Sequence, residues 1–184
     1  MPPSPRTAFS TWMTLSAAAA AIVTLAGCAQ SASGDNRSPS VVRHPIPGSD
    51  FPISSAVEIP PTATTVYLSG QVPPVVDASK PANDPAAYGG DTRAQTMGVL
   101  NTIDKQLKAM GLTMKDVVKM QVYLVGDPAK DNKMDFAGFM QGYTQFFGTA
   151  EQPNLPSRSA FQVAALANPA WYVEIEVTAV RMPK

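Results

Sequence analysis

From residue 51 onward, the chain alternates apolar and polar positions in short, regular runs that predict strands. Five segments are rich in β-branched and aromatic residues: 56–59, 64–69, 117–125, 159–166 and 171–180. In the last segment Val173, Ile175 and Val177 alternate with polar neighbours, which is typical of a strand with one buried face. The first two segments follow one another closely, so a hairpin can join them.

Two longer stretches place apolar residues three and four positions apart and predict helices. Asp91 or Thr92 can cap the first helix, which runs to about Met110, and the second covers about 133–147. The order β-β-α-β-α-β-β predicts an α+β fold with two helices packed on one face of a sheet. The opposite face keeps apolar residues, and oligomerisation is the simplest way to cover them.

The amino terminus has the order of a secretory signal. A weakly basic start with Arg6 precedes an apolar run at 15–25, which is too short to span a bilayer comfortably. The run ends in Leu-Ala-Gly-Cys at 25–28, which resembles a bacterial lipobox. Residues 1–27 are therefore expected to be a lipoprotein signal peptide, with Cys28 as the lipidation site. An ordinary signal peptide with an incidental cysteine is the alternative.

A polar stretch separates this signal from the regular pattern. Residues 28–50 are rich in Ser, Pro, Asp, Asn and Gly and predict a flexible tether, followed by one folded domain at 51–184. Acyl chains anchor a protein with ~0.8 kcal/mol per buried CH₂, so we expect membrane contact only through the lipid anchor. Ala29 after the cysteine favours the outer membrane. We expect an exported protein on the periplasmic side of that membrane.

The charge balance and the residue counts argue against several classes of function. Lys plus Arg and Asp plus Glu both number 14, so nothing in the composition favours a nucleic-acid partner. His44 is the only histidine and falls before the predicted domain, which leaves that domain without a histidine for general acid–base catalysis or a serine–histidine triad. One histidine and one cysteine do not make a usual metal site or an internal disulfide.

Five strings occur in order across residues 51–181 and together resemble the RidA/YjgF family, which is also labelled endoribonuclease L-PSP. They are Leu-Ser-Gly-Gln-Val-Pro at 68–73, a Leu-x-Ala-x-Gly segment that ends in Asp-Val-Val-Lys at 107–119, Tyr-x-x-Phe-Phe at 143–147, Pro-x-Arg-Ser at 156–159 and Val-Glu-Ile-Glu at 173–176. The resemblance implies a chorismate-mutase-like fold. It also implies a homotrimer with ligand sites in the clefts between subunits.

Members of that family hydrolyse small 2-imino and 2-enamino acids to 2-ketoacids and ammonia without a metal or organic cofactor, and the resemblance implies this reaction here. Arg158 is the expected anchor of the substrate carboxylate, because a guanidinium binds a carboxylate through two parallel hydrogen bonds. Glu174 is the expected catalytic group that orients a water molecule or takes its proton. Groups around Ser69, Gly70 and Ser159 are expected to bind the nitrogen end.

Three positions depart from the family pattern, and each replaces a polar group by an apolar one. Ile53 stands where deaminating members have a tyrosine, Met140 where they have an asparagine, and Ala160 where many have a cysteine. Ile53 and Met140 are still expected to line the substrate site. The hypothesis that follows is a pocket of low polarity, with a ligand larger and more apolar than 2-aminoacrylate or with slow turnover.

Two other functions compete with deamination. A non-catalytic envelope protein can use the same cleft to bind a ketoacid or another small carboxylate, which predicts binding without turnover. RNA cleavage is the other alternative. The neutral charge, the lack of a histidine in the predicted domain and the export signal argue against RNA cleavage.

Overall fold

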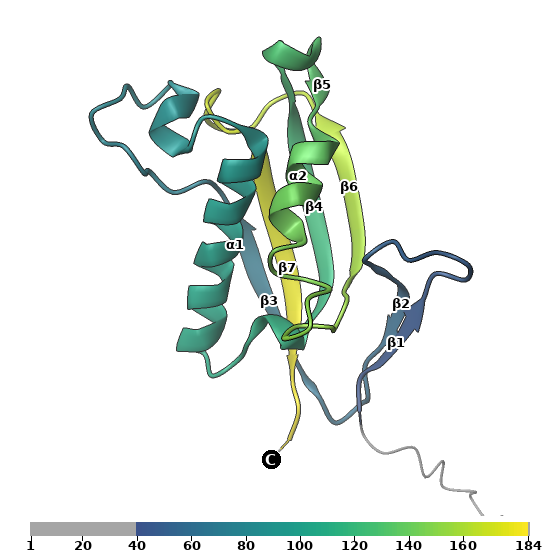
Figure 1. The fold of residues 1–184 in the computed structure, drawn as a ribbon. Helices are drawn as coiled ribbons and strands as arrows, with labels where there is room; N and C mark the ends of the chain where they lie inside the picture. Colours follow the sequence, from purple (N-terminus) through teal and green to yellow (C-terminus); the bar gives the residue numbers. More distant parts are fainter. Residues whose placement is uncertain (1–39, 184) are drawn as a thin grey trace, which may run out of the picture. The chain divides into compact units, whose positions relative to one another are not determined.

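The computed structural model describes residues 40–183. Its seven-stranded sheet has the order β1-β2-β6-β4-β7-β3, with β5 paired to β4 outside that path. The strands are β1 (Val42–Pro45), β2 (Ser54–Glu58), β3 (Thr64–Gln71), β4 (Val117–Asp127), β5 (Lys133–Met134), β6 (Ser157–Val163) and β7 (Val173–Arg181). The helices are α1 (Thr92–Ala109) and α2 (Phe136–Tyr143), with short 3-10 turns at Pro85–Tyr88, Met114–Asp116 and Pro128–Lys130 (Figure 1). The predicted signal peptide and Cys28 lie outside the described residues.

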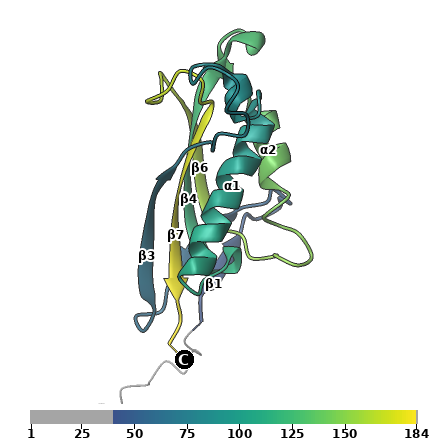
Figure 2. The ribbon, with the colours of Figure 1, turned by 90° about the vertical axis from the view of Figure 1, so that its left-hand side faces the viewer.

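The two helices pack side by side on one face of the sheet and leave the other face without a helix layer (Figures 1 and 2). Their apolar residues meet those of the central strands β4 and β7 in a core where Leu100, Ile103 and Met120 are fully buried. Burial of such side chains, at ~25 cal/mol per Å² of apolar surface, is the main favourable term in folding. The predicted arrangement of two helices on one face of a sheet is confirmed.

The prediction that a hairpin joins the first two predicted strands is wrong. β2 pairs with β1 and meets β6, whereas β3 pairs with β7 at the other end of the sheet. Pro60 and Pro61 between them lack the backbone N–H that a ladder requires. Pairing with β7 lets Leu68 of β3 join the core. The burial of an apolar face therefore decided this pairing, and proximity along the chain did not.

The folded part of the chain begins earlier than predicted, because β1 lies inside the stretch 28–50 assigned to the tether. Arg43 of β1 fixes this strand to the domain. Its guanidinium donates from Nη1 to the Leu155 carbonyl at 2.7 Å and from Nη2 to the Lys115 carbonyl at 3.0 Å. A four-residue strand that ends at a proline is too short to show a clear period within a stretch rich in serine and proline.

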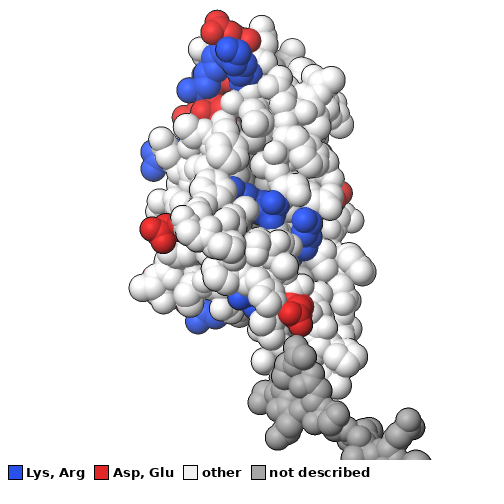
Figure 3. Space-filling model, turned by 90° about the vertical axis from the view of Figure 1, so that its right-hand side faces the viewer, with Lys and Arg blue, Asp and Glu red and all other residues white. Residues whose placement is uncertain are grey.

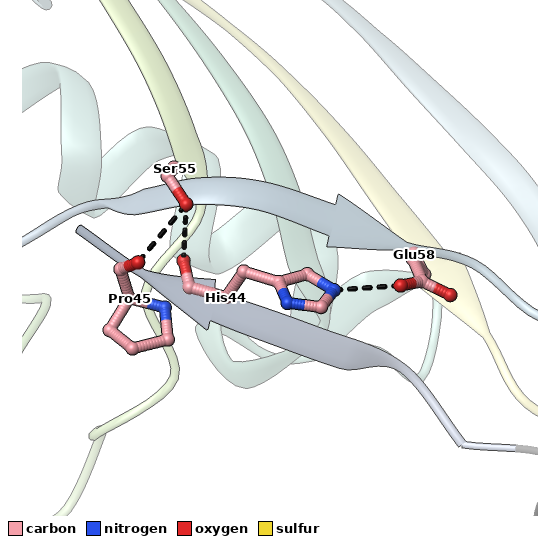
Figure 4. A network of polar contacts seen from close by, with 4 residues as sticks. All are labelled: His44, Pro45, Ser55 and Glu58. Carbon is pink, nitrogen blue, oxygen red and sulfur yellow. Dashed lines mark hydrogen bonds and ion pairs between the residues drawn. The ribbon is translucent and has the colours of Figure 1, made fainter. Parts of the chain in front are cut away.

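The histidine consequently lies within the fold, which corrects its placement before the domain. His44 Nε2 lies 2.7 Å from Glu58 Oε1 across the β1–β2 hairpin, and the Ser55 hydroxyl donates to the His44 carbonyl (Figure 4). The His44 and Glu58 side chains are 45% and 56% exposed. Exposed ion pairs contribute little to stability. We interpret this pair as a surface contact that closes the hairpin.

α2 is shorter than the predicted helix at 133–147. Asp135 caps it by accepting a hydrogen bond from the Gly138 N–H at 3.0 Å, and the two residues before Asp135 form β5 instead. Beyond Tyr143 the chain turns, yet the Phe147 N–H still donates to the Tyr143 carbonyl at 3.1 Å. The helical spacing of apolar residues therefore continues past the end of the helix, which explains the longer prediction.

Candidate active site

Arg158 lies on β6 and points into the helix layer. It sits opposite Met120 of β4, whose side chain is fully buried in the core. The guanidinium carbon lies 4.3 Å from the ring centroid of Tyr143 and 5.0 Å from that of Phe139, both on α2. Two further ring centroids, at 5.4 and 5.9 Å, belong to Phe51 and Phe136. These four rings form an aromatic cage around the cation.

The guanidinium is short of hydrogen-bond acceptors. Its Nη1 atom is buried and has no partner. Burial lowers the pKa of Arg158, and a hydrogen bond with the Tyr143 hydroxyl opposes part of that shift. Burial likewise raises the pKa of Tyr143, whose hydroxyl donates to the Pro52 carbonyl at 2.9 Å. Because an unpaired buried charge is costly, an anionic ligand that reaches Nη1 would gain a strong hydrogen bond.

Glu174 lies on β7 and points to the open face of the sheet. Its neighbours Val173 and Ile175 are fully buried against the helices, so the alternation of a strand turns Glu174 away from them. β3 carries a bulge between Leu68 and Gln71, where the register with β7 shifts. The bulge brings Gly70 so close to Glu174 that a Cβ at Gly70 would collide with the carboxylate.

Arg158 and Glu174 therefore lie on opposite faces of the same sheet within one chain. Ser159 follows Arg158 on β6 and alternates to the open face, opposite Gln121. The predicted residues thus separate into two groups. The cation half comprises Arg158 and its cage, with Met140 on α2 and Ile53 two residues after Phe51. The carboxylate half comprises Glu174, Ser69, Gly70 and Ser159.

Hydrogen bonds hold the bulge of the carboxylate half in place. The Gln71 side chain donates to the carbonyls of Ser69 at 2.9 Å and Gly70 at 3.2 Å. Gln106 of α1 in turn donates to the Gln71 side-chain oxygen at 2.7 Å. Sequence reasoning missed Gln106, because nothing in a helical pattern of apolar residues marks one glutamine among the polar positions.

Sequence reasoning also missed the cage. Phe136 and Tyr143 belong to the apolar residues whose spacing predicts the second helix, and Phe51 stands in a loop without any periodic signal. Only the pairing of β6 with β4 puts a cation beneath that helix. The position of Arg158 opposite an inward-facing residue of β4 is the signal that could have revealed it.

The open face carries exposed aromatic and polar side chains. Tyr67 is 80% exposed and Phe161 is 45% exposed. Gln121 and Tyr123 of β4 both donate to the Glu176 carboxylate at 3.2 Å. A hollow of about 380 Å³ lies beside this network. The Glu176 carboxylate is therefore already hydrogen-bonded by side chains of its own sheet.

Residues 40–183 hold no group of three or more metal-ligating side chains. Neither of their helices is both long and apolar enough to cross a membrane.

A family model and several known proteins match most of the chain in sequence. A family model described as Endoribonuclease L-PSP matches residues 47–181. A 2-iminobutanoate/2-iminopropanoate deaminase of Mus musculus is 33% identical over 137 residues, which is 74% of this chain and 87% of the relative. A RutC family protein of Haemophilus influenzae is 33% identical over 135 residues, which is 73% and 91% of the two chains.

Solved structures agree on the fold. A protein of unknown function of the conserved Rid family from Yersinia pestis aligns with a TM-score of 0.54 and 28% identity, over 74% of this chain and 96% of that one. A Thermotoga maritima protein aligns with a TM-score of 0.50 and 26% identity, over 77% and 94% of the two chains. The predicted α+β, chorismate-mutase-like fold is confirmed by these neighbours.

Proposed function

Because the chain belongs to the Endoribonuclease L-PSP family, also known as RidA/YjgF, we propose that it hydrolyses small 2-imino and 2-enamino acids to 2-ketoacids and ammonia. Relatives of about one-third identity that carry the name 2-iminobutanoate/2-iminopropanoate deaminase support this proposal. The single observation that carries it is the Arg158 guanidinium, whose buried Nη1 atom has no hydrogen-bond partner. This group suits the carboxylate that every 2-imino acid bears.

The second part of the proposal is that neighbouring copies share each site. Within one chain Arg158 points into the helix layer and Glu174 to the open face, so one substrate cannot touch both. A copy whose open face packs against the next one can bring its Glu174 to the neighbour's Arg158. The exposed Tyr67 and Phe161 on the open face favour such packing. We propose a homotrimer, the closed ring that the family resemblance implies.

The chemistry requires only positioning and one proton relay. Arg158 binds the substrate carboxylate, and the Glu174 carboxylate of the neighbouring copy accepts a proton from water as the water oxygen bonds to the imine carbon. That proton then passes to the substrate nitrogen, which gives a carbinolamine. Glu174 next accepts the proton of the new hydroxyl group and delivers it to the same nitrogen. The C–N bond then breaks, ammonia leaves, and the oxygen becomes the ketone of the 2-ketoacid. No cofactor takes part in this sequence.

Gly70 gives a test of how tightly the catalytic carboxylate is positioned. We expect Gly70→Ala to lower kcat by roughly tenfold or more, because a Cβ there displaces the Glu174 carboxylate and small misplacements are costly. Steady-state kinetics measure the effect. The double variant Gly70→Ala with Glu174→Gln serves as the control, since the glycine change should add little further loss to that of Glu174→Gln alone once the carboxylate that it displaces is gone. Wild-type kcat in Gly70→Ala would contradict this role.

A deaminase assay tests the proposed function. The full-length chain is added to 2-imino acids made in place by an amino-acid oxidase, and release of 2-ketoacid and ammonia is followed. We expect faster release than in buffer, with loss of the acceleration in Arg158→Ala. Carboxylate binding without acceleration would favour the non-catalytic binding protein instead.

RNA cleavage remains the weaker alternative, although His44 does lie within the fold. Its Nε2 atom is engaged with Glu58 on the surface hairpin. On the face shown in Figure 3, basic side chains are scattered among uncharged and acidic ones and form no continuous stripe. Retention of RNA at moderate salt would speak for this alternative.

We also propose that Cys28 carries the lipid anchor and holds the domain at the cell envelope. Fractionation of cells tests it. The wild-type chain should sediment with membranes, and Cys28→Ser should release it to the soluble fraction.

A further inference from the structure

The two outer rings of the aromatic cage differ from the two inner ones. Phe139 and Tyr143 are fully buried, whereas Phe136 is partly buried and Phe51 is 39% exposed. The outer rings stack on each other with centroids 6.4 Å apart and planes inclined by 21°. Phe51 and Phe136 therefore form the more exposed side of the cage around Arg158, an apolar surface called the wall from here on. A ligand that approaches the cation from this side contacts the wall.

The backbone positions of both outer rings are fixed. Phe136 is the first residue of α2, directly after the Asp135 cap. Phe51 lies in the loop between β1 and β2, and the next residue, Pro52, accepts the hydrogen bond from the buried Tyr143 hydroxyl. The Phe51 carbonyl also accepts a hydrogen bond from the Ile53 N–H at 2.7 Å. The wall is thus a built part of the site.

We propose that Phe51 and Phe136 select 2-imino acids with an aromatic or large apolar side chain, and that Phe51 is a specificity-determining residue. This inference rests on the proposed function. In a 2-imino acid, the side chain is attached to the carbon next to the carboxylate. A carboxylate held by Arg158 therefore places that side chain beside the cation, where the outer rings lie.

The chemistry of the wall favours a ring over a methyl group. A phenyl group can stack on the pair at the offset geometry that aromatic rings prefer, and it removes far more apolar surface from water than a methyl group does. Ile53, two residues after Phe51, and Met140, on the same helix as Phe136, are both uncharged. A polar side chain would therefore lose hydrogen bonds to water without gaining any from these residues.

The test compares the imines derived from phenylalanine and alanine on the full-length protein. We expect kcat/KM to be at least ~10-fold higher for the phenylalanine-derived imine, because apolar groups in such pockets discriminate by about this factor or more. Phe51→Ala should lower this ratio by roughly tenfold. Val76→Ala, which trims a 65% exposed apolar side chain in another loop, should leave the ratio unchanged. An equal or reversed preference in the wild type overturns the inference.

Binding of the 2-ketoacid products separates this inference from the proposed function. Calorimetry should give tighter binding of phenylpyruvate than of pyruvate to the wild type, with the difference reduced in Phe51→Ala. This preference without turnover of any imine would sink the deaminase proposal and support the selectivity. Turnover of imines together with equal binding of the two ketoacids would support the deaminase proposal and contradict the selectivity for aromatic side chains.

Discussion

Arg158→Ala is expected to lower kcat/KM for 2-imino acids by ~10²–10⁴-fold, because two charge-assisted hydrogen bonds to the carboxylate are lost at ~1.5–3 kcal/mol each. The loss should appear for every substrate, since every 2-imino acid carries the carboxylate. Steady-state kinetics measure it. Arg181→Ala is the matched control, because Arg181 is an exposed residue at the far end of β7 whose guanidinium donates to the Met110 carbonyl.

A second variant distinguishes a ligand anchor from a structural residue. Arg158→Met keeps much of the side-chain volume inside the aromatic cage but removes the buried charge. We expect the free energy of unfolding to be unchanged or increased, since replacing a buried charge by an apolar side chain is often neutral or stabilising. Activity should be lost as completely as in Arg158→Ala. A marked loss of stability in Arg158→Met would mean that the cation serves the fold.

Glu174→Gln is expected to lower kcat by ~10²–10⁴-fold, the range in which general acid–base groups contribute. The amide keeps the size of the side chain beside Gly70 but cannot accept the proton of the attacking water. KM should change little, because the carboxylate anchor at Arg158 is intact. Substrate titrations at fixed pH separate the two constants.

Glu176→Gln is the control for this prediction. Glu176 lies on the same strand and the same face, but its carboxylate is held by Gln121 and Tyr123. We expect kcat within about threefold of the wild type, as for surface changes away from the chemistry. Equal losses in the two variants would contradict the assignment of the catalytic role to Glu174 alone.

Local pattern was enough to predict the two-helix, one-sheet layout. The period of two in β7 and the spacing of three and four in α1 are local properties, and each element buries the face that its pattern marks. Strand pairing depends on the whole sheet. The separation of β2 from β3 and the addition of β1 follow from contacts far apart in sequence, such as Arg43 with Leu155.

For the candidate site as well, the sequence predicted some features and others needed the structure. Matching strings pointed to Arg158, Glu174 and the Ser69–Gly70 turn, and the structure brings the last two together. The strings carry no information on which face of the sheet each side chain occupies, so the separation of Arg158 from Glu174 needed the strand register. Phe51 was beyond reach of any pattern, because a loop residue has no period and its ring meets Arg158 only in three dimensions.

Sharing of each site between copies is tested most directly by mixing two inactive variants. Arg158→Ala retains Glu174, and Glu174→Gln retains Arg158, so a hybrid ring can join an intact guanidinium of one copy to an intact carboxylate of the next. If equal amounts assemble at random, about one-quarter of the sites in the ring are complete, and the mixture should regain about that share of wild-type activity. A mixture no more active than its two separate components, despite proven exchange of chains, would contradict a site formed by two copies.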